Sequence, residues 1–123
     1  FWDQAIYRYQ PGFPPSIQSI PPHGTGLLAV YPADSTSTAA YLGSSLHFSQ
    51  GTEVAEWDEN GRDLRLKLDL GRSLAGFIRL LLPRSPLKAL CGGKPINWTQ
   101  ESDRVYRFEV SSDKDASIQI HFQ

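Results

Sequence analysis

Acidic side chains are the first candidates for bond-breaking chemistry, because a glycosidase holds two carboxyl groups about 5 to 9 Å apart and raises the pKa of one by burial. In this sequence the acidic residues of interest gather at a tight turn and in the last connection: Glu53, Glu56, Asp58, Glu59, Asp113 and Asp115. We expect water to solvate all of these carboxylates. The sequence therefore predicts no catalytic pair.

Asp58 and Asp63 form one acidic pair whose spacing needs an explanation. If Asn60-Gly61 is a two-residue loop, the two side chains stand directly opposite each other, which is an unfavourable like-charge contact. Either a cation bridges the two carboxylates or the loop differs. Calcium takes about six to eight oxygen ligands, so two carboxylates are too few. We favour a wider loop and predict no metal site and no cofactor.

The histidines and the one cysteine offer no nucleophilic or metal-binding pattern. His23 is expected in a turn, His47 against a neighbouring module or solvent, and His121 on a wet face. Cys91 cannot form an internal disulfide, and we interpret it as a small apolar side chain rather than a nucleophile. Asn97-Trp98-Thr99 has the form of an N-glycosylation acceptor, but such triplets often arise by chance.

Aromatic side chains would be the signature of a sugar-binding face, because an exposed ring can stack against a sugar. Trp57 and Trp98 fall on the apolar side of two predicted hairpins, so we predict that both pack in the core. The other candidates form an N-terminal aromatic cluster, which is either a binding surface or a docking patch: Trp2, Tyr7, Tyr9 and Phe13.

These side chains must be positioned by β-strands, since the hydrophobic pattern has period two. Residues 63–70 alternate leucine with charged residues, and 106–110 and 118–122 repeat the alternation. Residues 77–82 are almost continuously apolar, which is typical of a central strand covered on both faces. Three weaker strands are predicted upstream: 16–20, 26–31 and 46–49.

Two tight turns predict hairpins, because Asn-Gly and Gly-Gly pairs accept positive φ angles. A two-residue loop at Asn60-Gly61 sets up three cross-strand pairs: Trp57 with Leu64, Ala55 with Leu66, and Glu56 with Arg65. A two-residue loop at Gly92-Gly93 sets up two more: Ala89 with Ile96, and Leu87 with Trp98. We predict an all-β fold, an antiparallel two-sheet β-sandwich of about eight or nine strands.

Length and charge restrict the function classes. A chain of 123 residues fits one domain, 1–123, with one core. A net charge of −1 gives no field that would attract nucleic acid or anionic lipid, and no apolar run is long enough to cross a membrane. We therefore predict neither a nucleic-acid nor a membrane partner. Localisation stays undecided. The chain opens at Phe1 and has no methionine, so we expect it to be part of a longer polypeptide.

Three segments resemble the C-terminal module of α-galactosidase-like (melibiase) glycoside hydrolases. Their order and spacing match as well, and they cover the first half of the chain: residues 1–3 (FWD), 20–30 (IPPHG leading into LLAV) and 41–51 (YLGSSLHFSQG). The second half is similar only as a generic alternating sheet.

The resemblance implies an antiparallel sandwich packed on the end of a (β/α)₈ barrel that supplies two catalytic aspartates. No segment of this chain resembles the barrel strands that carry those aspartates, so no catalytic residue is transferred. The leading hypothesis is a non-catalytic accessory domain whose partner is the catalytic barrel of the same polypeptide. The alternative is a carbohydrate-binding module that uses exposed aromatic side chains. A third hypothesis, an independent small enzyme, needs a concave polar site that these residues do not assemble.

Overall fold

The fold is seen in a computed structural model that describes residues 22–23, 38–47 and 51–123. The described residues form nine strands: β1 (Ala40–Ser44), β2 (Val54–Glu59), β3 (Asp63–Leu68), β4 (Leu74–Leu81), β5 (Pro86–Cys91), β6 (Lys94–Pro95), β7 (Trp98–Ser102), β8 (Val105–Ser112) and β9 (Ala116–Phe122). The predicted strands at 16–20 and 26–31 lie outside the described residues.

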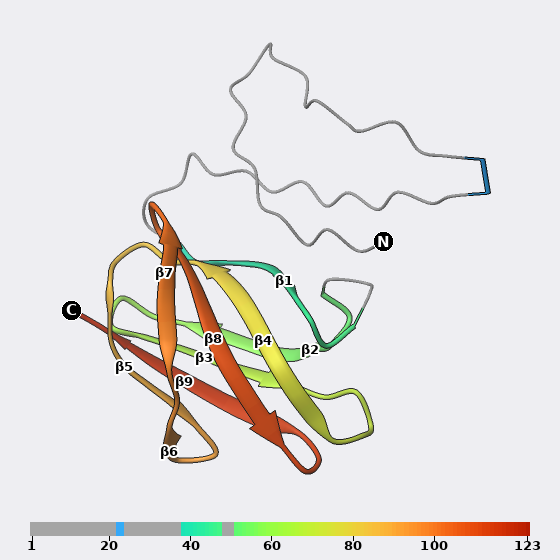
Figure 1. Ribbon diagram of the computed structural model, residues 1–123. Coiled ribbons are helices and arrows are strands. Elements are labelled where there is room, and N and C mark those ends of the chain that lie inside the picture. The colour runs from blue at the N-terminus through green and yellow to red at the C-terminus, as the bar shows by residue number, and fades with distance from the viewer. Residues whose placement is uncertain (1–21, 24–37, 48–50) are drawn as a thin grey trace.

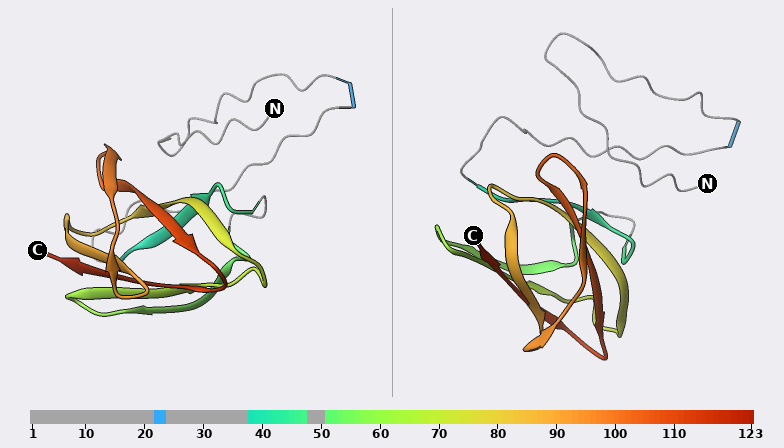
Figure 2. Two further views of the ribbon diagram at one scale, coloured as in Figure 1. Left: turned by 60° about the horizontal axis from the view of Figure 1, so that its bottom comes forward. Right: turned by 60° about the vertical axis from the view of Figure 1, so that its left-hand side comes forward.

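The nine strands make two antiparallel sheets that pack face to face (Figures 1 and 2). Sheet A has the order β1-β4-β8-β7, and sheet B has the order β2-β3-β9-β5-β6. Neither sheet closes on itself, and every strand pair is antiparallel. The predicted two-sheet β-sandwich is confirmed.

The core lies between the sheets and is built from every second residue of the long strands. Leu64, Leu66 and Leu68 of β3 are at most 3% exposed, while Arg65 between them faces solvent. The inward residues of β4, β8 and β9 join the same cluster: Leu74, Ile78, Leu80, Tyr106, Phe108, Val110, Ala116, Ile118, Ile120 and Phe122. Period-two alternation therefore predicted β3, β8 and β9 correctly, because each sheet has one face against the other sheet and one face outward.

Two predictions about strands hold only in part. We expected 77–82 to be covered on both faces, but β4 begins at Leu74 and its outward face is covered unevenly: Leu81 is buried, whereas Phe77 and Arg79 are half-buried. We also expected a strand at 46–49. β1 ends at Ser44, and Leu46 follows it as a core residue outside any strand, while residues 48–49 of the predicted range lie outside the described residues. Apolar runs cannot distinguish burial on two faces from burial on one face with partial cover on the other.

The β2–β3 hairpin keeps the predicted faces but not the predicted pairs. The loop residues are Gly61 and Arg62, and Asn60 is the first residue of the turn. Its side-chain Oδ1 accepts hydrogen bonds from the backbone amides of Arg62 and Asp63, each at 2.8 Å, which closes the turn. The observed pairs are shifted by two residues: Glu59 with Leu64, Asp58 with Arg65, and Trp57 with Leu66. Asp58 and Asp63 are therefore not opposite each other. The wider loop that we favoured is therefore wrong: the loop keeps two residues but begins one residue later than first assumed.

The β5–β6 hairpin follows the prediction at its turn and departs from it further on. Gly92 and Gly93 have φ angles of 59° and 82°, and the Ile96 amide donates to the Ala89 carbonyl at 3.0 Å, as the Gly-Gly turn predicts. The predicted pair of Leu87 with Trp98 is wrong. After two residues of β6 the chain crosses to sheet A, where Trp98 lies opposite Phe108.

Candidate functional site

A buried carboxylate, Glu53, is the polar group that sequence reasoning missed. We expected it to be solvated beside a turn, but it is 0% exposed. Its Oε1 accepts the hydroxyls of Tyr41 at 2.7 Å and Ser44 at 2.6 Å, and its Oε2 accepts the amide of Gly51 at 3.0 Å. We call Tyr41, Ser44, Gly51 and Glu53 the Glu53 cluster. Its geometry serves to fix backbone and hydroxyl groups of the β1–β2 region.

The local chain is shaped to bring these groups together. A β-bulge interrupts the pairing of β1 with β4 between Tyr41 and Gly43, and Gly43 has a φ angle of 152°, which side chains rarely allow. The Asp69 amide donates to the Glu53 carbonyl at 2.8 Å, so the residue is also tied to the end of β3. The one sequence signal was a glutamate two residues after Gly51 in a segment rich in hydroxyl side chains.

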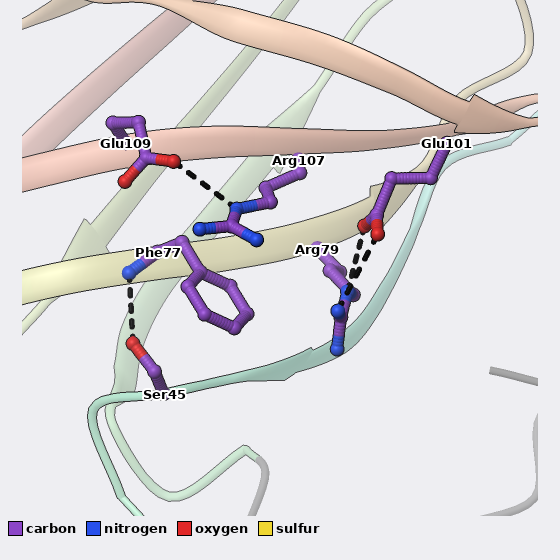
Figure 3. A network of polar contacts seen from close by, with 6 residues as sticks. All are labelled: Ser45, Phe77, Arg79, Glu101, Arg107 and Glu109. Carbon is purple, nitrogen blue, oxygen red and sulfur yellow. Dashed lines mark hydrogen bonds and ion pairs between the residues drawn. The ribbon is translucent and has the colours of Figure 1, made fainter. Parts of the chain in front are cut away.

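A second polar network covers the outward face of sheet A (Figure 3). Arg79 of β4 pairs with Glu101 of β7, with Nε to Oε1 at 2.7 Å and Nη2 to Oε2 at 3.4 Å. Arg107 of β8 donates from Nε to Oε1 of Glu109 at 3.1 Å. We call these four residues, together with Phe77, the Phe77 network.

Phe77 lies under both arginines of this network. The guanidinium carbon of Arg107 is 3.9 Å from the ring centroid and that of Arg79 is 4.8 Å away. Both distances are within the range of cation–π attraction. The Phe77 amide donates to the Ser45 hydroxyl at 2.9 Å, which ties the network to the segment that follows β1. The ring and the two carboxylates thus hold both guanidinium groups in fixed orientations.

The outward face of sheet B is also polar but is organised by exposed pairs. Lys67 and Asp115 form an ion pair of 3.2 Å, and His121 pairs with Asp63 across β3 and β9. The side-chain hydrogen bond with Lys67 lowers the pKa of Asp115, and the same bond raises the pKa of Lys67. Both groups stay in contact with water, so the pair holds charge at the surface without burying it.

A shallow hollow of about 390 Å³ lies over this face of sheet B. The residues that turn their side chains outward around it come from β2, β3 and β9: Glu56, Asp58, Arg65, Lys67, Ser117 and Gln119. Two acidic and two basic groups cancel, so the hollow has no net charge. Its donors and acceptors suit a neutral, polar ligand better than an ion.

The tryptophan predictions have two outcomes. Trp57 is partly buried and packs against the core cluster, as predicted. Trp98 is 36% exposed, so its predicted core position is wrong; its ring is tilted by 34° against Phe108 with 6.3 Å between centroids. The reason is the crossing after β6, which places Trp98 on the edge strand β7. The aromatic candidates Trp2, Tyr7 and Tyr9 lie outside the described residues.

The other sequence candidates are dispersed over the molecule. His23 occupies a turn with a φ angle of 64°, as expected, and His47 is half-buried. Cys91 lies in the core cluster, where burial raises the pKa of its thiol. Within the described ranges, no group of three histidine, cysteine or acidic residues is placed to hold a metal ion. No helix in this part of the chain is long and apolar enough to span a bilayer.

Comparison with known proteins identified no relative. No family model matches the chain, and neither the curated proteins nor the solved structures include a significant match.

Proposed function

We propose that this sandwich is a non-catalytic accessory domain of an α-galactosidase-like glycoside hydrolase, packed on a (β/α)₈ barrel of the same polypeptide. The observation that carries the proposal is the Glu53 cluster. Tyr41, Ser44 and Gly51 belong to one of the three segments that resemble that family, and the carboxylate of Glu53 binds all three. In this chain the segment therefore serves to hold the fold.

Three other acidic groups support the same function. Glu59 accepts the Ala39 amide at 2.7 Å, Glu101 is paired with Arg79, and Asp63 with His121. Each of these carboxylates ties one strand to another chain segment. Carboxylates that hold strands together in this way have a structural role, since a catalytic carboxylate must face the bond that it breaks.

The test is to express the complete polypeptide that carries residues 1–123, a form without them, and the 123-residue chain alone. Turnover of an aryl α-galactoside and thermal unfolding are measured for each. We expect turnover by the complete polypeptide, none by the chain alone, and a lower unfolding temperature or insolubility for the shortened form. Turnover by the chain alone, or equal barrel stability with and without it, would contradict the proposal.

A second candidate function, carbohydrate binding, is favoured by the neutral hollow on sheet B. Neutral sugars present alternating hydroxyl donors and acceptors, and Arg65, Gln119 and Asp58 supply both kinds of partner on its walls. Aromatic stacking was the mode that we expected from the sequence. The described lining is mainly polar, and Trp57, which also contributes to it, is partly buried against the core cluster.

Calorimetric titration with neutral galacto- and gluco-oligosaccharides tests this second function. A Kd below about 1 mM would support it. Arg65→Ala and Gln119→Ala should each weaken binding about tenfold, which corresponds to the loss of roughly 1.4 kcal/mol. Arg62→Ala, in the exposed β2–β3 turn and outside the lining of the hollow, is the matched control and should bind as the wild type does. Absence of heat with every sugar would remove the candidate.

A further inference from the structure

The triplet Asn97-Trp98-Thr99 is a sequence motif that the proposed function does not use. It has the N-x-S/T form of an acceptor for an N-linked glycan, which is a bulky group that only the surface of a folded protein can accommodate. In sequence alone such a triplet is a frequent chance occurrence. Its value as a modification site therefore depends on where the fold places it.

Asn97 lies in the connection between β6 and β7, where the chain crosses from sheet B to sheet A. All three residues of the triplet are exposed. The Asn97 carbonyl accepts the Glu109 amide at 3.0 Å, which fixes the backbone at this point. The Asn97 side-chain amide has no hydrogen bond to another residue in the described part of the chain. Its Nδ2 atom is therefore open to solvent and is not needed to hold the fold.

The two polar residues of the triplet face away from the core. Thr99 lies opposite Arg107, an outward residue of β8, whereas Trp98 lies opposite the buried Phe108. Because successive side chains of an extended chain point to opposite faces, Asn97 and Thr99 share the outward side. A glycan on Asn97 would thus project into water and leave the contact of the Trp98 ring with Phe108 unchanged.

The region that such a glycan would cover is the edge of sheet A. Among the described strands β7 is the last one on this side of the sheet, and all five of its residues are exposed. It contains neither lysine nor proline, which are residues that commonly keep an edge strand from pairing with another chain. A bulky, hydrated group directly before β7 would supply the same protection.

We propose that Asn97 is a modification site, the acceptor for an N-linked oligosaccharide that shields the β7 edge. The donor class is an oligosaccharide carried on a lipid pyrophosphate, transferred by a membrane-bound enzyme. The Asn97 Nδ2 forms a bond to the anomeric carbon of the sugar and gives up one proton, while the bond from that carbon to the pyrophosphate oxygen breaks and the lipid pyrophosphate leaves with its electron pair. This site is independent of the accessory function and goes beyond it.

The experiment is to secrete the complete polypeptide that carries residues 1–123 from a eukaryotic cell and to treat it with an N-glycosidase, which converts a glycosylated asparagine to aspartate. Peptide mass spectrometry should show this conversion at Asn97. Thr99→Ala removes the hydroxyl and should abolish the conversion, whereas Thr99→Ser should retain it. Asn60, in the exposed β2–β3 turn, has no hydroxyl residue two positions on. Arg62→Thr completes a triplet there and is the matched positive control.

The outcomes separate the acceptor site from its shielding role. Unmodified Asn97 in the secreted wild type overturns the proposal, and modified Asn60 in Arg62→Thr then shows that the transferase reached this domain. Light scattering of the glycosylated form and of Thr99→Ala tests the shielding, and we expect Thr99→Ala to self-associate at a lower protein concentration. Equal self-association of the two forms would overturn the shielding role. Neither result affects the accessory function, which is tested by removal of residues 1–123.

Discussion

The Glu53 cluster and the Phe77 network are two polar assemblies close together in the fold, and they differ in their contact with water. Glu53 is fully buried, and its carboxylate accepts hydrogen bonds from Tyr41, Ser44 and Gly51 among the described residues. The Phe77 network lies on an outward face, and Glu109 within it is 54% exposed. A buried donor that loses its acceptor keeps its full desolvation cost, whereas an exposed donor turns to water. The difference teaches that the cluster secures the fold and the network is free to serve a surface role.

Glu53→Ala should have the largest effect, because it leaves the Tyr41 and Ser44 hydroxyls and the Gly51 amide without their acceptor. An unsatisfied buried group costs about 1 to 3 kcal/mol and a half-buried one costs less, so for the buried Ser44 hydroxyl and the half-buried Tyr41 and Gly51 groups together we expect a loss of about 3 kcal/mol in the free energy of unfolding. Urea denaturation measures it. Glu53→Gln keeps one acceptor oxygen and should lose about half as much. Equal stability of Glu53→Ala and wild type would contradict the claim that the Glu53 cluster secures the fold.

Gly76→Ala tests the junction between the two assemblies. A Cβ atom on Gly76 would stand 2.3 Å from the Ser45 Oγ and 3.1 Å from a Leu46 methyl carbon. The Ser45 hydroxyl would have to move away and give up the hydrogen bond that it accepts from the Phe77 amide. Overpacking of this kind lowers the free energy of unfolding by roughly 1 to 3 kcal/mol. Thermal unfolding gives the value. Adding Ser45→Ala should recover part of the loss, and a double variant no better than the single one would point to Leu46 as the obstacle.

Phe77→Leu removes the ring under both arginines while keeping an apolar side chain. Exposed cation–π contacts contribute about 0.5 to 1 kcal/mol each, so we expect a loss of about 1 kcal/mol, well below that of Glu53→Ala. Phe77→Tyr retains the ring and serves as the matched control. A loss as large as that of Glu53→Ala would mean that the outward face of sheet A is structural rather than free to serve a surface role.

The exposed Lys67–Asp115 pair should have the smallest effect and a defined pH dependence. The pKa of Asp115 is lowered in the folded state, so its contribution is present above the pKa of an unfolded aspartate, about 3.9, and disappears as the pH falls through the folded value. The raised pKa of Lys67 places the alkaline loss above its usual range. Urea midpoints of wild type and Lys67→Met should differ slightly at pH 7 and converge in acid. A difference that stays constant down to pH 2 would show that the pair does not contribute.

How far the sequence predicts this molecule is clearest in its two hairpins. Gly92-Gly93 predicted its turn correctly, because a two-residue hairpin loop of this type needs a positive φ angle at both positions and glycine accepts such angles. Asn60-Gly61 predicted the hairpin correctly, but its cross-strand pairs are displaced by two residues. The Asn60 side chain accepts hydrogen bonds from two backbone amides, so Asn60 precedes the loop instead of being its first residue. A shift by two leaves every side chain on its predicted face, so the fold class was unaffected.

The candidate sites were less predictable than the fold. Glu53 sits between a glycine-containing turn and an alternating strand, where the sequence pattern indicates solvent. Its burial depends on Tyr41 and Ser44, which reach it through the bulge at Gly43. Likewise, Arg79 and Arg107 are 28 positions apart in sequence but directly opposite each other in the β4–β8 pair. No local pattern encodes such a meeting.

The sequence by itself determined the class of fold and the composition of its core, because period-two alternation must bury one face of each strand whatever the order of the strands. Only the tertiary structure decided which carboxylate is buried, which tryptophan is exposed and which arginines share a ring. Those outcomes depend on which strands become neighbours and where the chain crosses between sheets. Both are set by contacts between residues far apart in the chain.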